Sequence, residues 1–281
     1  MTDRPALNRL SYCVTPLTMF KGDVELSRAT GFFYTVPTNG VRCFRLVSNW
    51  HVFSGRHTAF PNAALDKQLQ IPDTIMFEVM KVVGEIIETY EIRTNLYNGT
   101  EAIWKQHQSK NAVDVALIDL GSGPENGEVL GVNEVANQWD MKIEIGDDVF
   151  VLGYPLNFSH FARTAIWKRG TIASEPNYVT PDSNNRIILD ATTRSGMSGS
   201  PVILRQKTHY VSESGAVVEK PNASRILGVY SSRPNFTPTG AAQAIDGFED
   251  KRAEVGYMVK SGYIQQIIEE GICGPRYGEL P

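Results

Sequence analysis

The sequence predicts an all-β protein. Short runs of apolar and aromatic residues recur along the chain, and Gly, Pro, Asn and Asp separate them, which is the pattern of strands joined by turns. A hydrophobic content of 42% with 21% charged residues is typical of a globular protein. The 281 residues can hold one large domain or two small ones.

The first informative strand is the run Phe44–Val52, which alternates large apolar and polar residues. It carries His51 at its end. The other histidines, His57, His107, His160 and His209, do not follow such a run. A histidine at a strand end is more often structural than catalytic, so His51 alone does not indicate a catalytic site.

The second strand is Asp114–Leu120, an apolar run with a carboxylate at its start. A carboxylate in this place can accept the Nδ1 proton of an imidazole. Asp119 lies within the same run and is the competing candidate. Asp114 is preferred because it stands at the mouth of the predicted sheet, while Asp119 lies inside it.

The third element is the turn Arg194–Pro201, which leads into the apolar run Val202–Leu204. A serine becomes a nucleophile only with a base within hydrogen-bond reach and backbone N–H groups directed at the oxyanion. Gly196 and Gly199 flank Ser198 and allow the backbone to turn tightly around it. Taken alone, this segment is equally compatible with an ordinary glycine-serine loop.

In chain order the three residues are His51, Asp114 and Ser198, and here the sequence resembles the chymotrypsin-fold, trypsin-like serine peptidases. The resemblance extends over about residues 28–270. The other segments that carry it are Thr30–Tyr34, Val149–Pro155, Lys168–Ser174, Ile226–Ser232 and Val255–Ile264.

This resemblance implies two six-stranded antiparallel β-barrels with the active site between them. We expect one peptidase domain over residues 1–281, with barrels at 10–130 and 145–258 and a C-terminal helix at 259–272. Three stretches are long for this architecture: 60–111, which could hold strands or a helical insertion, 205–225 and 234–254. Their simplest interpretation is variable surface structure.

The resemblance also implies a serine endopeptidase that works without cofactor or metal, with Gly196 and Ser198 supplying the oxyanion hole. The alternative is a catalytically silent binding module that uses the same cleft. Both interpretations make a protein or peptide the partner, and an activating or inhibiting protein partner is a further expectation.

The residues around Ser198 indicate a branch of the family. Met197 stands where an aspartate would bind a newly cut N-terminus, so activation by that ion pair is not expected. The segment Leu189–Pro201 resembles the nucleophile motif of Deg/HtrA-type and related bacterial peptidases, in which the equivalent of Asp190 is structural. Too few residues follow the predicted helix for a PDZ domain, so we expect a single-domain bacterial or phage type.

The substrate pocket is also inferred from the resemblance. Thr192 and Thr193 would form its base and Tyr230 would project toward its wall. Ser231 would bind the triad aspartate, and Ser232 and Arg233 would continue along the rim. An uncharged pocket that is partly filled by a phenol predicts a small or medium uncharged P1 residue, and Arg233 could favour an acidic residue nearby.

Composition argues against other classes of function. A net charge of −4 gives no general attraction to nucleic acid or acidic membranes, and no apolar run approaches the ~20 residues of a membrane helix. The first residues do not resemble a secretory leader. The three cysteines, Cys13, Cys43 and Cys273, offer no disulfide across the His51 loop, so we expect a reducing, cytoplasmic setting.

Overall fold

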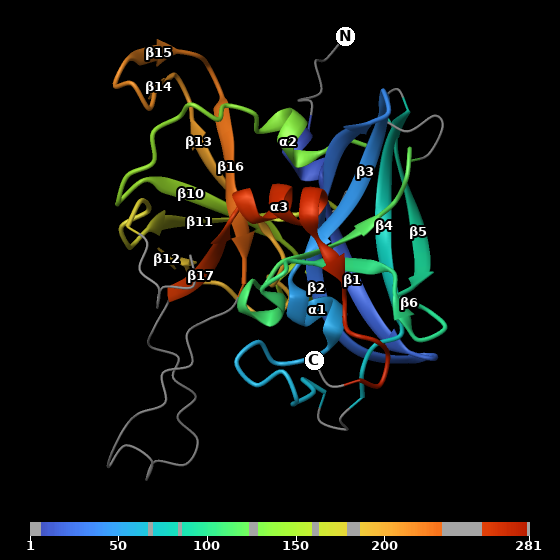
Figure 1. Ribbon diagram of the computed structural model, residues 1–281. Coiled ribbons are helices and arrows are strands. Elements are labelled where there is room, and N and C mark those ends of the chain that lie inside the picture. Colours follow the sequence, from blue (N-terminus) through green and yellow to red (C-terminus); the bar gives the residue numbers. More distant parts are fainter. Residues whose placement is uncertain are drawn as a thin grey trace, which may run out of the picture.

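The computed structural model describes residues 7–66, 70–83, 86–123, 129–158, 163–178, 186–231 and 255–279. Its strands form two large sheets that lie side by side, one from each half of the sequence (Figure 1). The predicted all-β class is confirmed, with antiparallel strands throughout both sheets and few helices.

The N-terminal half forms an eight-stranded sheet in the order β18-β8-β9-β3-β2-β1-β4-β5. Its strands are β1 (Val14–Lys21), β2 (Val24–Thr38), β3 (Val41–Ser48), β4 (Thr74–Val83), β5 (Ile86–Asn95), β8 (Trp104–Gln106), β9 (Ala116–Asp119) and β18 (Ile272–Cys273). Two more short strands, β6 (Tyr97–Asn98) and β7 (Glu101–Ala102), pair with each other.

This sheet has more than the six strands that the resemblance implied. One reason is β18, which follows the last helix and returns to pair with β8. Another is the long β4–β5 hairpin, which shows that the 60–111 stretch continues as strands. Ile75, Phe77 and Val79 alternate into the core along β4, as the period of a strand requires.

The second half forms a closed barrel in the order β10-β11-β12-β17-β16-β13, with the expected six strands. They are β10 (Asp148–Gly153), β11 (Ile166–Ile172), β12 (Arg186–Asp190), β13 (Pro201–Gln206), β16 (Ala223–Tyr230) and β17 (Val255–Lys260). The 205–225 stretch contains a separate hairpin of β14 (His209–Val211) and β15 (Val217–Glu219). The 234–254 stretch lies outside the described residues.

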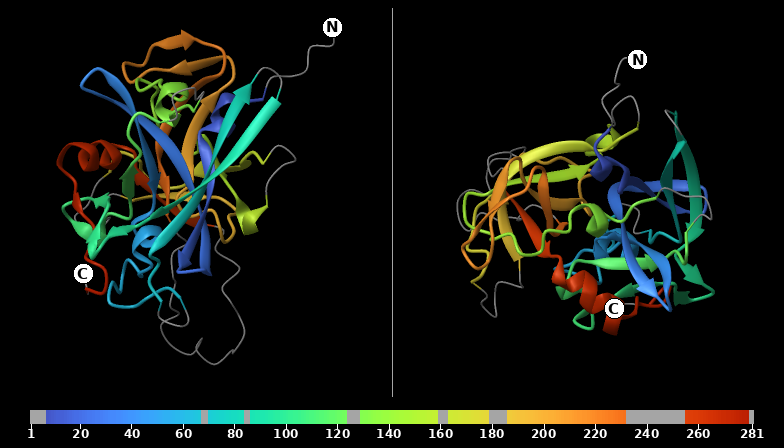
Figure 2. Two further views of the ribbon diagram at one scale, coloured as in Figure 1. Left: turned by 90° about the vertical axis from the view of Figure 1, so that its right-hand side faces the viewer. Right: turned by 90° about the horizontal axis from the view of Figure 1, so that it is seen from above.

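Helices are short. They are α1 (Trp50–Ser54), α2 (Val132–Val135), α3 (Gly262–Glu270) and the 3-10 turns η1 (Arg9–Tyr12), η2 (Lys110–Ala112) and η3 (Pro155–Asn157). Helix α3 lies on the face where the two halves meet, as Figures 1 and 2 show, and it buries Ile264 and Ile267 there.

Three apolar clusters hold the fold together. One fills the N-terminal sheet around Trp50 and Trp104, and another fills the closed barrel around Leu204 and Met258. The third joins residues of both halves, among them Phe32, Val47, Leu152, Ile203 and Ile264. Burial of such an interface fixes the two halves relative to each other, and with them the loops that face each other across it.

Candidate active site

His51 lies in the first turn of α1, immediately after β3 ends at Ser48. Its ring nitrogen Nδ1 lies 2.8 Å from Oδ2 and 3.0 Å from Oδ1 of Asp114, and its backbone N–H donates to Oδ1 at 3.0 Å. Asn49 donates from Nδ2 to the backbone oxygen of Asp114 at 2.8 Å. Backbone and side-chain contacts therefore fix the imidazole on this carboxylate through Nδ1.

Asp114 is completely buried, two residues before β9 begins. Ser231 donates from Oγ to Oδ2 of Asp114 at 2.5 Å, as the resemblance implied. Burial alone would raise the pKa of Asp114, but the attraction and hydrogen bonds of His51 and the hydrogen bond of Ser231 hold this pKa below its usual range. Asp114 is thus an ionised group directed at His51.

Asp119, the competing candidate, lies elsewhere. It is exposed at the end of β9, where it accepts an ion pair from Arg45 Nη1 at 2.8 Å and a hydrogen bond from the N–H of Gly121. Its contacts are those of a surface residue. Of the two aspartates, the structure brings only Asp114 to His51.

Ser198 lies in the tight turn between β12 and β13. Gly196 and Gly199 have φ angles of 93° and 86°, which residues other than glycine rarely adopt. A Cβ on Gly196 would meet the backbone oxygen of Tyr154, and one on Gly199 would meet the backbone oxygen of Thr30. Both glycines are therefore required by backbone conformation and by close packing.

Thr30, on β2 of the N-terminal sheet, holds this turn in place through hydrogen bonds from the other half of the molecule. Its backbone N–H donates to the oxygen of Ser198 at 2.9 Å, and its Oγ1 donates to the oxygen of Gly196 at 2.7 Å. The same Oγ1 accepts the N–H of Tyr154 at 3.1 Å. The sequence analysis missed this role, because nothing local in the sequence distinguishes Thr30 from any other strand threonine.

The backbone N–H groups on either side of Met197 remain available in this turn. The N–H groups of Met197, Gly199 and Ser200 all donate to backbone oxygens. Those of Gly196 and Ser198 donate to no acceptor among the described residues. These are the two N–H groups that the resemblance assigned to an oxyanion hole, and their availability is what such a hole requires.

Ser198 and His51 line the same cavity, of about 180 Å³, together with Gly196. Within the described part of the chain no hydrogen bond joins Ser198 Oγ to His51. In enzymes without substrate this contact is often long and tightens when substrate binds. The structure therefore places the His51 and Ser198 side chains at one cavity, without a hydrogen bond between them in the described part of the chain.

The predicted substrate pocket is uncharged where the structure describes it. Thr193 and Tyr230 are both buried, and their side-chain oxygens lie 2.5 Å apart. The Tyr230 ring lies directly over Gly256, where it would meet any added Cβ. Thr192 is half-buried. Ser232 and Arg233 lie outside the described residues.

Two further sequence predictions concern residues near the nucleophile. Met197 is fully buried in the apolar cluster of the closed barrel, so this position has no charged group for an N-terminal amine. Asp190 is exposed at the end of β12, where its backbone pairs with Thr171 and Val255.

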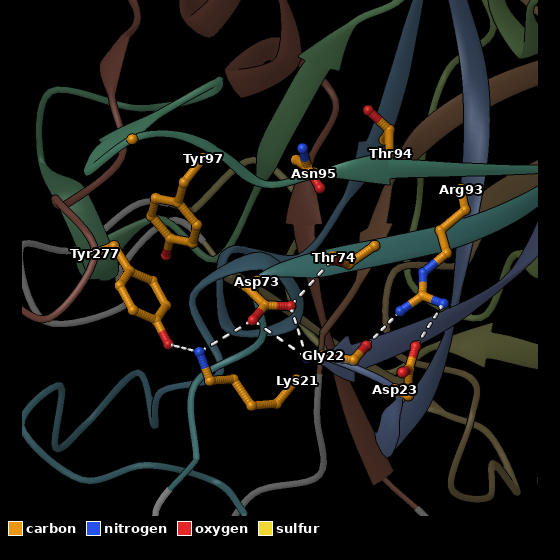
Figure 3. Close-up of a pocket in the computed structure, with 11 residues that line it drawn as sticks. Lys21, Gly22, Asp23, Asp73, Thr74, Arg93, Thr94, Asn95, Tyr97 and Tyr277 are labelled. Carbon is orange, nitrogen blue, oxygen red and sulfur yellow. Dashed lines mark hydrogen bonds and ion pairs between the residues drawn. The ribbon is translucent and has the colours of Figure 1, made fainter.

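A larger cavity, of about 650 Å³, lies on the N-terminal half away from the triad residues. Figure 3 shows Lys21, Asp73 and Tyr277 directed at one another within it, and Arg93 beside Asp23. Two positive and two negative side chains line it, so the described lining carries no excess charge.

The described residues contain no group of three or more His, Cys, Asp or Glu side chains that could hold a metal ion. No helix in the described part of the chain is long and apolar enough to span a membrane. Cys13, Cys43 and Cys273 are all free thiols.

Comparison with known proteins gives a match to a peptidase family model. A family model described as a trypsin-like peptidase domain matches residues 29–210. No curated protein sequence matches the chain significantly.

Three solved structures that are similar to this chain are proteases. The active form of the Rv3671c protease from M. tuberculosis has 16% identity and a TM-score of 0.45, over 93% of this chain and 81% of that one. A serine endoprotease from Yersinia pestis has 12% identity and a TM-score of 0.47, over 95% and 66%. The thermostable serine protease AL20 from an extremophilic microorganism has 11% identity and a TM-score of 0.46, over 92% and 97%.

The family model covers more than half of the chain, from strand β2 through the nucleophile turn to β14. The chain therefore belongs to the trypsin-like peptidase domain family.

Proposed function

We propose that this protein is a serine endopeptidase that cleaves peptide bonds through an acyl-enzyme intermediate. The observation that carries the proposal is the single cavity lined by His51, Gly196 and Ser198, with the buried carboxylate of Asp114 behind His51. A binding module that uses only the cleft would not need an ionised carboxylate on this histidine.

In the first half of the reaction, Ser198 Oγ attacks the carbonyl carbon of the scissile bond and His51 Nε2 takes its proton. Asp114 accepts the Nδ1–H bond, holds this tautomer and stabilises the imidazolium that forms. The N–H groups of Gly196 and Ser198 bind the oxyanion, each with a contribution of about 3 kcal/mol to the transition state.

The tetrahedral intermediate then collapses. The carbon–nitrogen bond breaks, His51 gives its proton to the leaving amine, and the acyl group stays on Ser198. Water enters, gives its proton to His51 and attacks the ester carbon. The acid product leaves and Ser198 Oγ recovers the proton from His51, so the enzyme returns to its starting state.

For specificity we propose a small uncharged P1 residue, such as glycine or alanine. The family resemblance puts the P1 pocket over Thr193 and Tyr230. The Tyr230 phenol is only 3% exposed and is held by Thr193, so it occupies the space that a larger P1 side chain would need. The nearest described charge is the Arg194 guanidinium, which donates to the backbone oxygen of Thr193 at 3.2 Å and not to the hydroxyl or the phenol.

We also propose that the final approach of Ser198 to His51 depends on substrate or on an activating partner. The support is the missing hydrogen bond between two side chains that line one cavity. The cytoplasmic setting inferred from the cysteines would make such restraint useful.

The test is hydrolysis of an unstructured protein such as casein, followed by mass spectrometry of the products. We expect wild-type protein to cut after small uncharged residues and the Ser198→Ala variant to lose activity by roughly 10⁴-fold or more. Retention of a tenth of the activity by Ser198→Ala would exclude this mechanism.

A further inference from the structure

A second cavity, of about 210 Å³, continues from the catalytic cleft across the outer face of the N-terminal sheet. Arg28 lines both cavities, so the two share a wall. The charged residues of the second cavity, here called the acidic groove, are Glu25, Arg28, Glu78, Glu91 and Arg163.

Strand register explains why these side chains share one face. Arg28 on β2 pairs with Thr18 on β1, which pairs with Met76 on β4. Two residues further along the sheet, Glu78 pairs with Glu91 on β5. Because residues two apart point to the same side of a sheet, the groove runs from the cleft across β1 to the two glutamates.

The groove carries excess negative charge, since three carboxylates face two guanidinium groups. Glu25 and Arg28 form a closed bidentate pair, with distances of 2.6 and 2.9 Å. Arg163 is therefore the cation of the groove that is left to neutralise both Glu78 and Glu91. It forms an ion pair with Oε1 of Glu78 and lies 3.7 Å from Oε1 of Glu91. One guanidinium for two carboxylates leaves one negative charge without a partner.

Glu78 is the unusual member of the groove. It is only 4% exposed, yet its Oε2 has no hydrogen-bond partner among the described residues. Burial, together with the charge of Glu91, raises the pKa of this carboxyl, although Arg163 opposes the rise. A buried carboxylate whose charge is incompletely paired is costly, and a cation bound beside it relieves this cost.

We propose that the acidic groove binds a lysine or arginine side chain of the peptide substrate, C-terminal to the scissile bond. This inference rests on the proposed function and names a feature of its substrate. The direction follows from the cleft: the P1 side chain lies toward Thr193 and Tyr230, so the peptide leaves past His51 toward Arg28. The cation lies beside the exposed Glu91 carboxylate and supplies the second positive charge for Glu78 and Glu91, which otherwise share Arg163.

Cleavage of a fluorogenic peptide library, varied at the four positions after the scissile bond, tests the proposal first. We expect lysine and arginine to be enriched at one of these positions. Two peptides that differ only in lysine or norleucine there then serve as substrates. A library profile without preference for basic residues at any of the four positions would overturn the proposal.

Variants locate the effect. With Glu78→Gln or the exposed Glu91→Gln, kcat/KM for the lysine peptide falls about tenfold, the range of a hydrogen bond to a charged group, while the norleucine peptide changes less than twofold. Glu144→Gln is the control, because Glu144 pairs with Lys142 on the surface and lines neither cavity. Equal losses for both peptides would contradict a charge-recognition role.

A binding measurement separates this proposal from the catalytic one. Fluorescence anisotropy with the Ser198→Ala variant compares the same two peptides, and we expect the lysine peptide to bind about tenfold more tightly. If wild-type protein cuts no peptide but this preference is present, the catalytic mechanism fails and the groove stands. Equal binding of the two peptides refutes the groove even if cleavage occurs.

Discussion

Replacement of Thr30 by valine tests whether the N-terminal sheet positions the nucleophile turn. Valine has nearly the same shape, so the change removes the hydroxyl and little else. It leaves the oxygen of Gly196 without its 2.7 Å donor and the N–H of Tyr154 without its 3.1 Å acceptor, both in a fully buried place.

The size of the effect follows from these two contacts. A buried polar group that loses its partner costs about 1–3 kcal/mol, and two groups lose theirs, so Thr30→Val is expected to lower the free energy of unfolding by about 2–6 kcal/mol. We expect kcat to fall as well. Without the Thr30 hydroxyl the Gly196 peptide is no longer held by this hydrogen bond, so its N–H is no longer oriented toward the oxyanion. Loss of one such donor costs about 10²–10³ in kcat.

Thr15→Val is the matched control. Thr15 is also a fully buried strand threonine, with an Oγ1 that donates to the oxygen of Pro16 and accepts the N–H of Glu78, but it does not touch the nucleophile turn. Urea unfolding and steady-state hydrolysis of a small-P1 peptide measure the two effects. We expect both variants to lose stability and only Thr30→Val to lose kcat, with recovery in Thr30→Ser. Equal kinetic losses in the two valine variants would refute a positioning role for Thr30.

The remaining predictions concern the pocket and the acid of the triad. Tyr230→Val opens the pocket, so kcat/KM for a leucine P1 peptide rises relative to alanine; unchanged ratios would show that the phenol does not limit P1. Asp114→Asn lowers kcat about 10⁴-fold through loss of the correct imidazole tautomer, whereas Asp119→Asn changes kcat less than twofold. Because the folded-state pKa of Asp114 is depressed, its contribution to stability is full above the usual Asp range and is lost as pH falls through the lowered pKa. Urea unfolding between pH 5 and 2 should therefore show a smaller loss of stability for Asp114→Asn than for wild type.

Much of the site could be predicted because its chemistry constrains local sequence. Ser198 needs glycines on both sides for backbone conformations that the structure then shows at Gly196 and Gly199. The sequence favours Asp114 over Asp119 because Asp114 stands at the start of its strand and Asp119 lies within it, and the structure brings Asp114 to His51. Requirements of this kind act on neighbouring residues, so they can be recognised in the amino-acid sequence.

The rest depends on contacts between distant segments. The bond from Thr30 to Gly196 joins residues 166 apart in the sequence, and a strand threonine has no mark of such a role. The same holds for β18, which joins the first sheet only after the chain has crossed the second barrel. The first sheet has eight strands where the resemblance implied six, while the closed second barrel has the expected six.

The central claim is that Ser198 is a nucleophile activated by His51. Incubation with a fluorophosphonate, followed by peptide mass spectrometry, tests it most directly, since the reagent forms a stable bond only with an activated serine. The proposed function predicts a single modified residue, Ser198, in wild-type protein, and no modification in His51→Ala. Modification of a different serine, or equal rates in wild type and His51→Ala, would contradict the account.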